Sequence, residues 1–268
     1  MRPPFAAVYF DCDSTLSSIE GIDELLKLAG ESQSADANEL AQRAAASEHS
    51  SIDDLLEAAG RRADIVELTR KAMEGTLPLA EVYEARLRLL APRRAQLDRI
   101  GELYVQHVVP HAREVVHALQ HVGKHVGILS GGLLVPVHAL ARHLGIPLAN
   151  VHAVPLFFDG QGGYVDFDRS SPLWRNRGKI EVVQRLPADH RPLAFVGDGI
   201  TDLETQGHVE LFVGFGGVVA RPAVKAGAQA FVAGKTLAPI LAHVLTERER
   251  ARLAADQAFA PVLAAAGA

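Results

Sequence analysis

The sequence predicts an α/β protein: a doubly wound, Rossmann-like parallel sheet with an all-helical cap domain inserted after its first strand. Three observations carry this prediction. Residues 5–9 form a continuous apolar run, which is typical of a strand buried on both faces of a parallel sheet. Residues 17–107 have apolar positions at helical spacing and no strand signal. From residue 110 onward, short apolar runs alternate with helical segments, as they do in a sheet covered by helices on both faces.

The inserted segment is expected to contain several helices. Pro78 is favoured in the first turn of a helix, and the residues after it place Leu79, Val82, Tyr83 and Leu87 on one face. Residues 31–51 have few large apolar side chains, which indicates a weakly packed helix or a loop. The other expected helices cover residues 22–29, 52–56, 65–73 and 95–109.

The chain after residue 108 is expected to supply the remaining strands. A hairpin is predicted within residues 154–168, because two short apolar runs there flank a glycine-rich turn. One or two helices are predicted in the tail from residue 237. Further strands are expected at residues 126–129, 193–196, 211–213 and 230–232, and helices at 111–121, 133–143 and 179–186. The resulting division is an α/β core of residues 1–16 and 108–245, a helical cap of 17–107 and a helical tail of 246–268.

Composition excludes several classes of protein. The chain has 268 residues, of which 48% are hydrophobic, so it is long enough and apolar enough to form a large core. Its formal net charge of −5 gives no general attraction for nucleic acid or an anionic membrane. Cys12 has no second cysteine with which to form a disulfide, and no apolar run reaches the roughly 20 residues of a membrane span. Residues 1–4 do not resemble a signal peptide. We therefore expect a cytoplasmic protein.

Polar side chains follow three of the predicted strands. Asp11 and Asp13 follow the first, Ser130 with two glycines follows the second, and Asp198 with Asp202 follows a third. Ligands of open α/β sheets bind at the carboxyl ends of the strands. Two acids at such an edge repel each other unless a cation lies between them, which favours a divalent ion with oxygen ligands. The segment after Ser130 is expected to begin a helix, whose free N–H groups favour an anion such as phosphate.

Each of these residues also has a simpler interpretation. The acids and Ser130 are residue types that cap turns and helices. Lys179 follows Gly178 near a predicted helix start, where a lone lysine is usually solvated. Cys12 lies between two anions, which disfavours a thiolate, so it is not interpreted as a nucleophile.

Taken together, these segments match a known set of motifs. In chain order they resemble the four motifs of the haloacid dehalogenase-like phosphatase superfamily, and they are most similar to those of the phosphoserine phosphatases within it. The similarity covers about residues 5–235, and the four motifs in this order are strongly specific for the superfamily but less so for the substrate. The motifs are Asp11-Cys12-Asp13-Ser14-Thr15, Leu129-Ser130-Gly131-Gly132, Gly178-Lys179 and Gly197-Asp198-Gly199-Ile200-Thr201-Asp202.

The resemblance implies a Mg²⁺-dependent phosphomonoester hydrolase. Asp11 would be the nucleophile that forms an aspartyl-phosphate, and Asp13 would protonate the leaving alcohol and then take a proton from water. Mg²⁺ would be bound by the Asp11 carboxylate, the Asp13 backbone carbonyl and the Asp198 carboxylate, where it neutralises phosphate charge. Asp202 would order the water around the metal or orient Lys179.

The same resemblance implies residues that bind the substrate. Ser130, the Gly131 N–H and Lys179 would hold the phosphoryl oxygens. Glu20 and Arg86 occupy the positions at which phosphoserine phosphatases read the serine ammonium and carboxylate, and arginine binds a carboxylate through two hydrogen bonds. The residues implied in substrate binding by position are Glu20, Arg86 and, more weakly, Thr201. The alternative for Glu20 is a solvated residue or an acid at a helix start. The alternative for Arg86 is a solvated residue or a surface ion pair along its own helix.

Some features depart from the family pattern and leave the substrate open. Residues 31–64 make the cap longer than usual, Leu79 replaces an aromatic residue, and Val154-Pro155 replaces Asn-Arg. Two interpretations therefore stay open: a phosphoserine phosphatase, or a relative that acts on another small phosphomonoester. A third interpretation is a phospho-accepting receiver domain, but receivers lack both an acid two residues after the nucleophile and an inserted helical cap. No nucleic-acid or membrane partner is expected, and the sequence does not indicate an oligomeric state.

Overall fold

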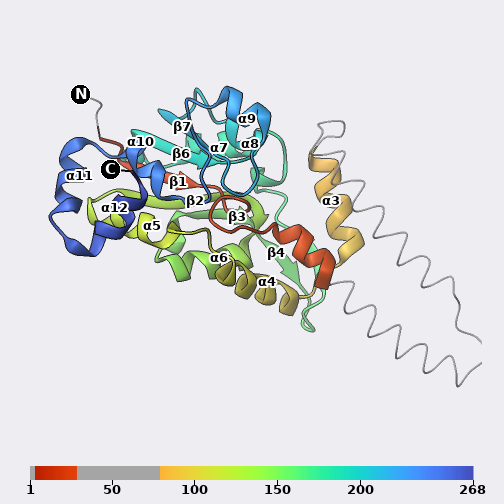
Figure 1. Ribbon diagram of the computed structural model, residues 1–268. Coiled ribbons are helices and arrows are strands. Elements are labelled where there is room, and N and C mark those ends of the chain that lie inside the picture. The colour runs from red at the N-terminus through yellow and green to blue at the C-terminus, as the bar shows by residue number, and fades with distance from the viewer. Residues whose placement is uncertain (1–3, 29–78, 268) are drawn as a thin grey trace, which may run out of the picture.

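The core of the protein is a six-stranded parallel sheet with the strand order β3-β2-β1-β6-β7-β8. Figure 1 shows it in a computed structural model, which describes residues 4–28 and 79–267. The strands are β1 (Ala7–Phe10), β2 (His125–Leu133), β3 (Val151–Val154), β6 (Leu193–Gly197), β7 (Leu211–Phe215) and β8 (Ala230–Val232). The order changes direction between β1 and β6, which are hydrogen-bonded neighbours. Ligands of doubly wound sheets bind at such a switch point.

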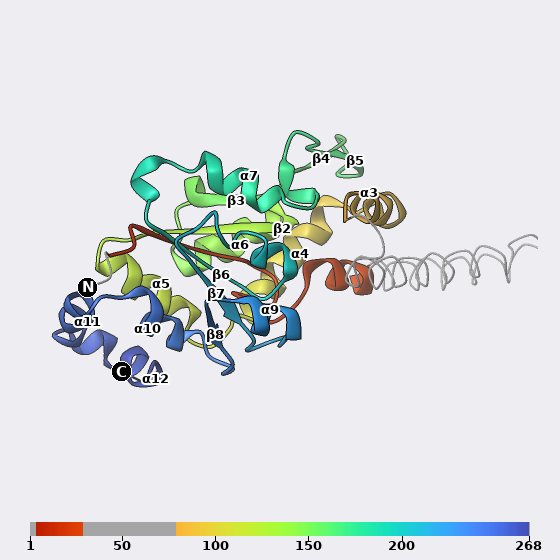
Figure 2. The same ribbon diagram turned by 90° about the horizontal axis from the view of Figure 1, so that it is seen from above.

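Strand β1 is the centre of the core. Its four residues are apolar and fully buried, because β1 pairs with β2 on one side and β6 on the other and is covered by helices on both faces. A helical layer lies on each side of the sheet (Figures 1 and 2). One layer contains α5 (Ala112–His121) and α6 (Leu134–Leu144). The other contains α7 (Gly178–Arg185), α8 (Ile200–Leu203) and α9 (Pro222–Gly227). The predicted fold class is confirmed.

A smaller unit stands beside the carboxyl ends of the strands. It contains a helical segment at residues 21–28, helix α3 (Leu79–Leu90) and the antiparallel hairpin of β4 (Leu156–Phe158) and β5 (Tyr164–Phe167). Figure 2 shows α3 next to the hairpin. Arg169, just after β5, donates hydrogen bonds of 3.0 Å to both carboxylate oxygens of Glu84, and the ring of Tyr83 meets that of Phe167 edge-on. These contacts join α3 to the hairpin. Among the described residues, no helix has the length and apolarity needed to cross a membrane.

Helix α4 (Arg94–Gln106) follows α3 and packs along α6, so it is attached to the helical layer of the sheet. Its apolar side chains Leu97, Ile100 and Tyr104 are buried against that layer. Gly101 lies where α4 and α6 approach closely, because a Cβ there would be 2.7 Å from the Cβ of Ala139.

Apart from shifts of a few residues at their ends, the predicted strands and α-helices differ from the structure in the following respects. Strand β2 continues through Ser130 to Leu133, so the Ser-Gly-Gly segment lies on the end of the strand and α6 begins only at Leu134. Strand β3 was not predicted, because its four residues run almost directly into the hairpin. The short helices α8 and α9 were not predicted either. The tail forms three short helices instead of one or two, namely α10 (Leu241–Val244), α11 (Glu247–Ala254) and α12 (Ala260–Ala265). The helices predicted within residues 31–73 lie outside the described residues.

Candidate active site

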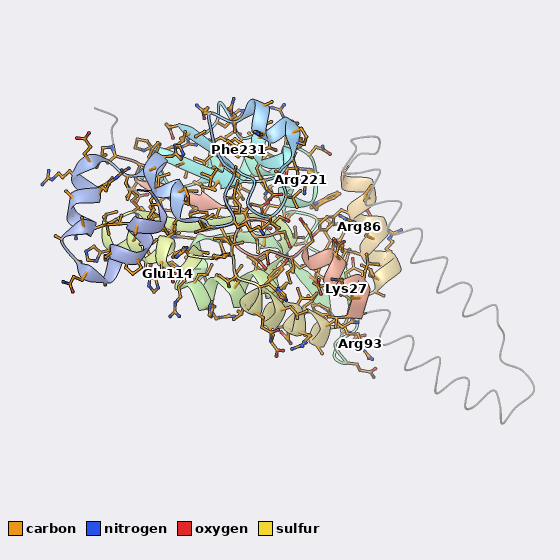
Figure 3. All side chains as sticks on the ribbon, in the orientation of Figure 1. Lys27, Arg86, Arg93, Glu114, Arg221 and Phe231 are labelled. Atoms are coloured by element: carbon orange, nitrogen blue, oxygen red, sulfur yellow. The ribbon has the colours of Figure 1, made fainter. Side chains whose placement is uncertain are left out.

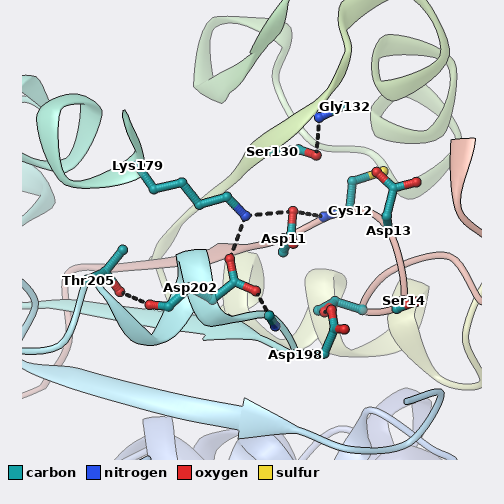
Figure 4. Close-up of polar contacts among 12 residues, drawn as sticks. Asp11, Cys12, Asp13, Ser14, Ser130, Gly132, Lys179, Asp198, Asp202 and Thr205 are labelled. Atoms are coloured by element: carbon teal, nitrogen blue, oxygen red, sulfur yellow. Dashed lines mark hydrogen bonds and ion pairs between the residues drawn. The ribbon is translucent and has the colours of Figure 1, made fainter. Parts of the chain in front are cut away.

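The candidate site lies at the carboxyl ends of β1, β2 and β6, where six of the polar residues singled out in the sequence meet (Figure 4). Asp11 and Asp13 follow β1, Ser130 lies in the extended end of β2, and Asp198 follows β6. The last two, Lys179 and Asp202, come from the first turns of α7 and α8. The parallel register aligns these strand ends, since Phe10 pairs with both Ile128 and Val196.

Lys179 joins two of the carboxylates. Its side chain is 5% exposed, and its Nζ lies 3.0 Å from Asp11 Oδ1 and 2.5 Å from Asp202 Oδ1. Burial alone would lower the pKa of Lys179, but the two carboxylates outweigh burial and raise the pKa above its ordinary value. The other oxygen of Asp202 accepts the backbone N–H of Gly199 at 2.8 Å. Lys179 is therefore a fixed cation at the site, and Asp202 orients it.

Asp11 and Asp13 have different environments although they are two residues apart. Asp11 Oδ1 is paired with Lys179 and accepts the backbone N–H of Cys12 at 2.7 Å. Within the described residues no cation pairs with the Asp13 carboxylate, and its Oδ1 accepts the Gly21 N–H and the Tyr104 hydroxyl. Burial, followed by the charge of Glu20, raises the pKa of Asp13 to about 7. Asp13 can thus carry a proton near neutral pH while the Asp11 carboxylate faces a cation.

Asp198 is held by two donors from different parts of the chain. Its Oδ1 accepts the Thr15 hydroxyl at 3.0 Å, and its Oδ2 accepts Nε of Arg221 at 3.3 Å. Burial, followed by the charges of Asp202 and Asp11, raises the pKa of Asp198 to about 8. Carboxylate oxygens of Asp11, Asp198 and Asp202 all lie within 4.8 Å of one another. This set of crowded oxygen ligands fits a hard divalent cation, which would relieve the repulsion that raises the pKa of Asp198.

Ser130 and its glycines line the opposite side of the site. The Ser130 side chain is buried, and its Oγ accepts the Gly132 N–H at 3.0 Å. A Cβ at Gly132 would be 2.9 Å from Asp13 Oδ2, so only glycine leaves room for the carboxylate there. Gly131 is half-buried, and a Cβ there would lie 3.2 Å from the Leu173 carbonyl oxygen.

The three residues expected to read the substrate are placed differently. Glu20 Oε1 accepts the Ser14 hydroxyl at 2.6 Å, and the Glu20 side chain is 37% exposed. Arg86 projects from α3 (Figure 3) and is only 9% exposed, yet its Nε has no hydrogen-bond partner among the described residues. Thr201 is half-buried in the first turn of α8.

Two residues of the site were missed in the sequence. Arg221 lies in the loop after β7 (Figure 3) and contacts both Asp198 and Glu20, at 3.3 and 3.9 Å. Its position after a predicted strand was a signal that could have found it, because that strand ends at the same sheet edge. Tyr104 reaches Asp13 from α4. Nothing in the local sequence distinguishes Tyr104 from an ordinary core residue.

Comparison with known proteins shows the family of this chain. The family model described as haloacid dehalogenase-like hydrolase matches residues 8–205. The chain is 35% identical to the phosphoserine phosphatase of Mus musculus and 33% identical to that of Homo sapiens, each over 228 residues, which are 84% of this chain and 88% of the relative. A solved structure of a phosphoserine phosphohydrolase-like protein from Francisella tularensis subsp. tularensis SCHU S4 has a TM-score of 0.69 at 20% identity, covering 90% of this chain and 99% of that one. This chain belongs to the haloacid dehalogenase-like hydrolase family.

Proposed function

We propose that the chain is a Mg²⁺-dependent phosphatase that hydrolyses O-phosphoserine through an aspartyl-phosphate on Asp11. The observation that carries this proposal is the contrast between the two acids after β1. The Asp11 carboxylate faces Lys179, whereas burial raises the pKa of Asp13 to about 7. Two carboxyl groups in such different surroundings are suited to different tasks, one as nucleophile and the other as acid and base.

The reaction would proceed in two steps. Asp11 attacks phosphorus, the bond from phosphorus to the alcohol oxygen breaks, and Asp13 gives its proton to that oxygen. A water molecule then attacks the phosphorus, Asp13 takes the proton from the water, and the bond to Asp11 breaks. The Ser130 hydroxyl, the Gly131 N–H and Lys179 would hold the phosphoryl oxygens during both steps.

The acidic cluster would hold the metal ion. The Asp11 and Asp198 carboxylates and the Asp13 backbone carbonyl would be its protein ligands, and Asp202 would orient Lys179 beside it. When bound, Mg²⁺ would neutralise part of the phosphate charge, which allows an anionic nucleophile to approach an anionic ester. Thr15 and Arg221 fix the orientation of Asp198 through its two oxygens.

Glu20 and Arg86 would select the amino-acid part of the substrate. Arg86 is buried and its Nε lacks a partner among the described residues, so a substrate carboxylate would supply the missing interaction. Glu20 is partly exposed and lies near Asp13 and Arg221, where it could receive an ammonium group. Thr201 would contribute a weaker contact. The relatives named phosphoserine phosphatase support this substrate for the present chain.

The helices that precede α5 would cover the site and exclude water during the first step. The contact between the Gly21 N–H and Asp13 supports this role, because it ties the start of the helical segment at residues 21–28 to the acid. The partner of the protein would be a small phosphomonoester and not nucleic acid or a membrane. A cytoplasmic location is supported by the buried, unpaired Cys12, which suits a reducing compartment.

A phosphate-release screen tests the proposal. The panel contains O-phosphoserine, phosphoethanolamine, a sugar phosphate and p-nitrophenyl phosphate, each with Mg²⁺ and with excess chelator. We expect O-phosphoserine to have the highest kcat/KM, activity to vanish in chelator, and Asp11→Asn to release no phosphate. A preference for phosphoethanolamine or the sugar phosphate would refute the substrate assignment alone. Full activity in chelator would refute the metal assignment.

A further inference from the structure

Tyr104 lies inside the candidate site although it comes from α4, far along the chain from the acids. Its side chain is fully buried, and its hydroxyl donates a hydrogen bond of 2.5 Å to Asp13 Oδ1. Helix α4 is fixed to the core through its packing on α6. The hydroxyl is therefore held in place by the rigid layer of the sheet.

Two donors meet at the same oxygen of Asp13. Besides the Tyr104 hydroxyl, the Gly21 N–H donates to Oδ1 at 2.7 Å. A carboxylate oxygen accepts through two lone-pair directions, so Oδ1 has no direction left for a proton. When Asp13 is protonated, the proton must therefore be on Oδ2.

Oδ2, which accepts no hydrogen bond from the described residues, faces the part of the site proposed to hold phosphate. A Cβ built on Gly132 would lie 2.9 Å from Asp13 Oδ2 and 3.1 Å from Ser130 Oγ, so Oδ2 lies against the Ser130–Gly132 segment. The oxygen of a leaving alcohol bonded to a phosphoryl group at Ser130 would be on this side. The arrangement directs the proton toward the bond that breaks.

The space for the Tyr104 hydroxyl is also specific. A Cβ at Gly21 would be 2.2 Å from the Tyr104 hydroxyl oxygen, so any residue other than glycine would displace the hydroxyl. Gly21 thus contributes both a donor to Oδ1 and the room for the second donor.

We infer that Tyr104 is a positioning residue that, with the Gly21 N–H, occupies Asp13 Oδ1 and keeps the transferable proton on Oδ2. The inference rests on the proposed function, in which Asp13 protonates the alcohol. In that step the bond between phosphorus and the alcohol oxygen breaks, the electron pair stays on that oxygen, and the proton moves to it from Oδ2. Asp13 is left as a carboxylate with Oδ1 still held by its two donors.

The test compares Tyr104→Phe with a matched control, Tyr9→Phe. Tyr9 is also fully buried, and its hydroxyl pairs with His190 Nδ1 at 3.0 Å, away from Asp13. The readout is kcat/KM for O-phosphoserine and for p-nitrophenyl phosphate, because kcat/KM ends with release of the alcohol and is independent of the later hydrolysis of the phosphoenzyme. The serine alkoxide is a poor leaving group and needs the acid, whereas p-nitrophenolate does not.

We expect Tyr104→Phe to lower kcat/KM for O-phosphoserine by roughly 10- to 100-fold, part of the 10²–10⁴ that a general acid contributes, and to lower that for the aryl ester by less than about threefold. Tyr9→Phe should leave unchanged the ratio of kcat/KM for O-phosphoserine to kcat/KM for p-nitrophenyl phosphate. Gly21→Ala, which displaces the hydroxyl without removing it, should lower the same ratio. An unchanged ratio in both Tyr104→Phe and Gly21→Ala would overturn the inference.

A double-mutant cycle with Asp13→Asn separates this inference from the proposed function. If Tyr104 acts only through Asp13, Tyr104→Phe has no further effect on kcat/KM for O-phosphoserine in the Asp13→Asn background. Additive losses would show that Tyr104 acts in another way and would overturn the inference while Asp13 keeps its role. An Asp13→Asn variant with an unchanged ratio of alkyl to aryl ester would instead refute the proposed function, and the inference with it.

Discussion

Lys179→Met should destabilise the metal-free protein, because it removes the buried cation that joins Asp11 to the fully buried Asp202 carboxylate. Lys179 Nζ lies 3.0 Å from Asp11 Oδ1 and 2.5 Å from Asp202 Oδ1, and the Lys179 and Asp202 side chains are 5% and 0% exposed. Removal of one partner from a buried ion pair costs about 3–5 kcal/mol, since the other charge is left without compensation. Methionine keeps most of the side-chain volume, and protonation relieves part of the negative charge that is left without compensation. We therefore expect a loss of about 3 kcal/mol in the free energy of unfolding.

The measurement is urea denaturation in chelator at pH 7 for the native protein, Lys179→Met, Asp202→Asn and the double variant. The double variant should be more stable than the sum of the two single losses predicts, with a coupling energy of about 1–3 kcal/mol. Lys225→Met is the matched control, because Lys225 is exposed on α9, and its effect should be within about 0.5 kcal/mol. If Lys179→Met is as stable as Lys225→Met, or if the two single losses simply add, the ion pair of Lys179 and Asp202 does not stabilise the folded protein.

Three further predictions concern other parts of the molecule. Asp198→Ala should raise the Mg²⁺ concentration needed for half-maximal phosphate release at least tenfold, because a proposed ligand is lost; an unchanged requirement would exclude Asp198 as a ligand. Arg86→Ala should lower kcat/KM for O-phosphoserine by about 10²-fold and barely change that for p-nitrophenyl phosphate, which has no carboxylate; equal losses would make Arg86 structural. In the C-terminal helices, burial alone would raise the pKa of Glu249, but hydrogen bonds from Lys124 Nζ (2.6 Å) and Thr246 outweigh it and leave the pKa below its ordinary value. The folded-state pKa is the lower one, so this stabilisation is present at neutral pH and is lost as the pH falls through that pKa. Glu249→Gln should therefore cost about 1–3 kcal/mol at pH 7 and less at pH 4 in urea titrations, and an equal cost at both would refute the assignment.

The parts of the site that were predictable are those in which a residue's role follows from its own strand. Asp11 and Asp198 each come directly after a continuous apolar run, and such runs end at one edge of a parallel sheet. Local sequence was therefore enough to place both acids at that edge. The same reasoning identified β1, β6 and β7 and the hairpin of β4 and β5.

The parts that were not predictable depend on contacts between distant segments. Tyr104 has the spacing of a core residue of α4, and only the packing of α4 on α6 directs its hydroxyl toward Asp13. The extension of β2 beyond Ser130 depends on pairing of Leu133 with Val154 of β3, a strand too short to recognise. In both cases tertiary contacts determine the structure, and periodicity within the segment does not reveal them.

The central claim, that Asp11 carries the phosphoryl group, is tested most directly by trapping the intermediate. The Asp13→Asn variant, which should hydrolyse its phosphoenzyme very slowly, is mixed with Mg²⁺ and p-nitrophenyl phosphate, whose leaving group does not need the acid, and is then quenched in acid, digested and analysed by mass spectrometry. We predict one added phosphoryl group on the peptide that contains Asp11, localised to Asp11, and none in a parallel sample of Asp11→Asn. A phosphoryl group on another residue, or substantial phosphate release by Asp11→Asn, would contradict the account.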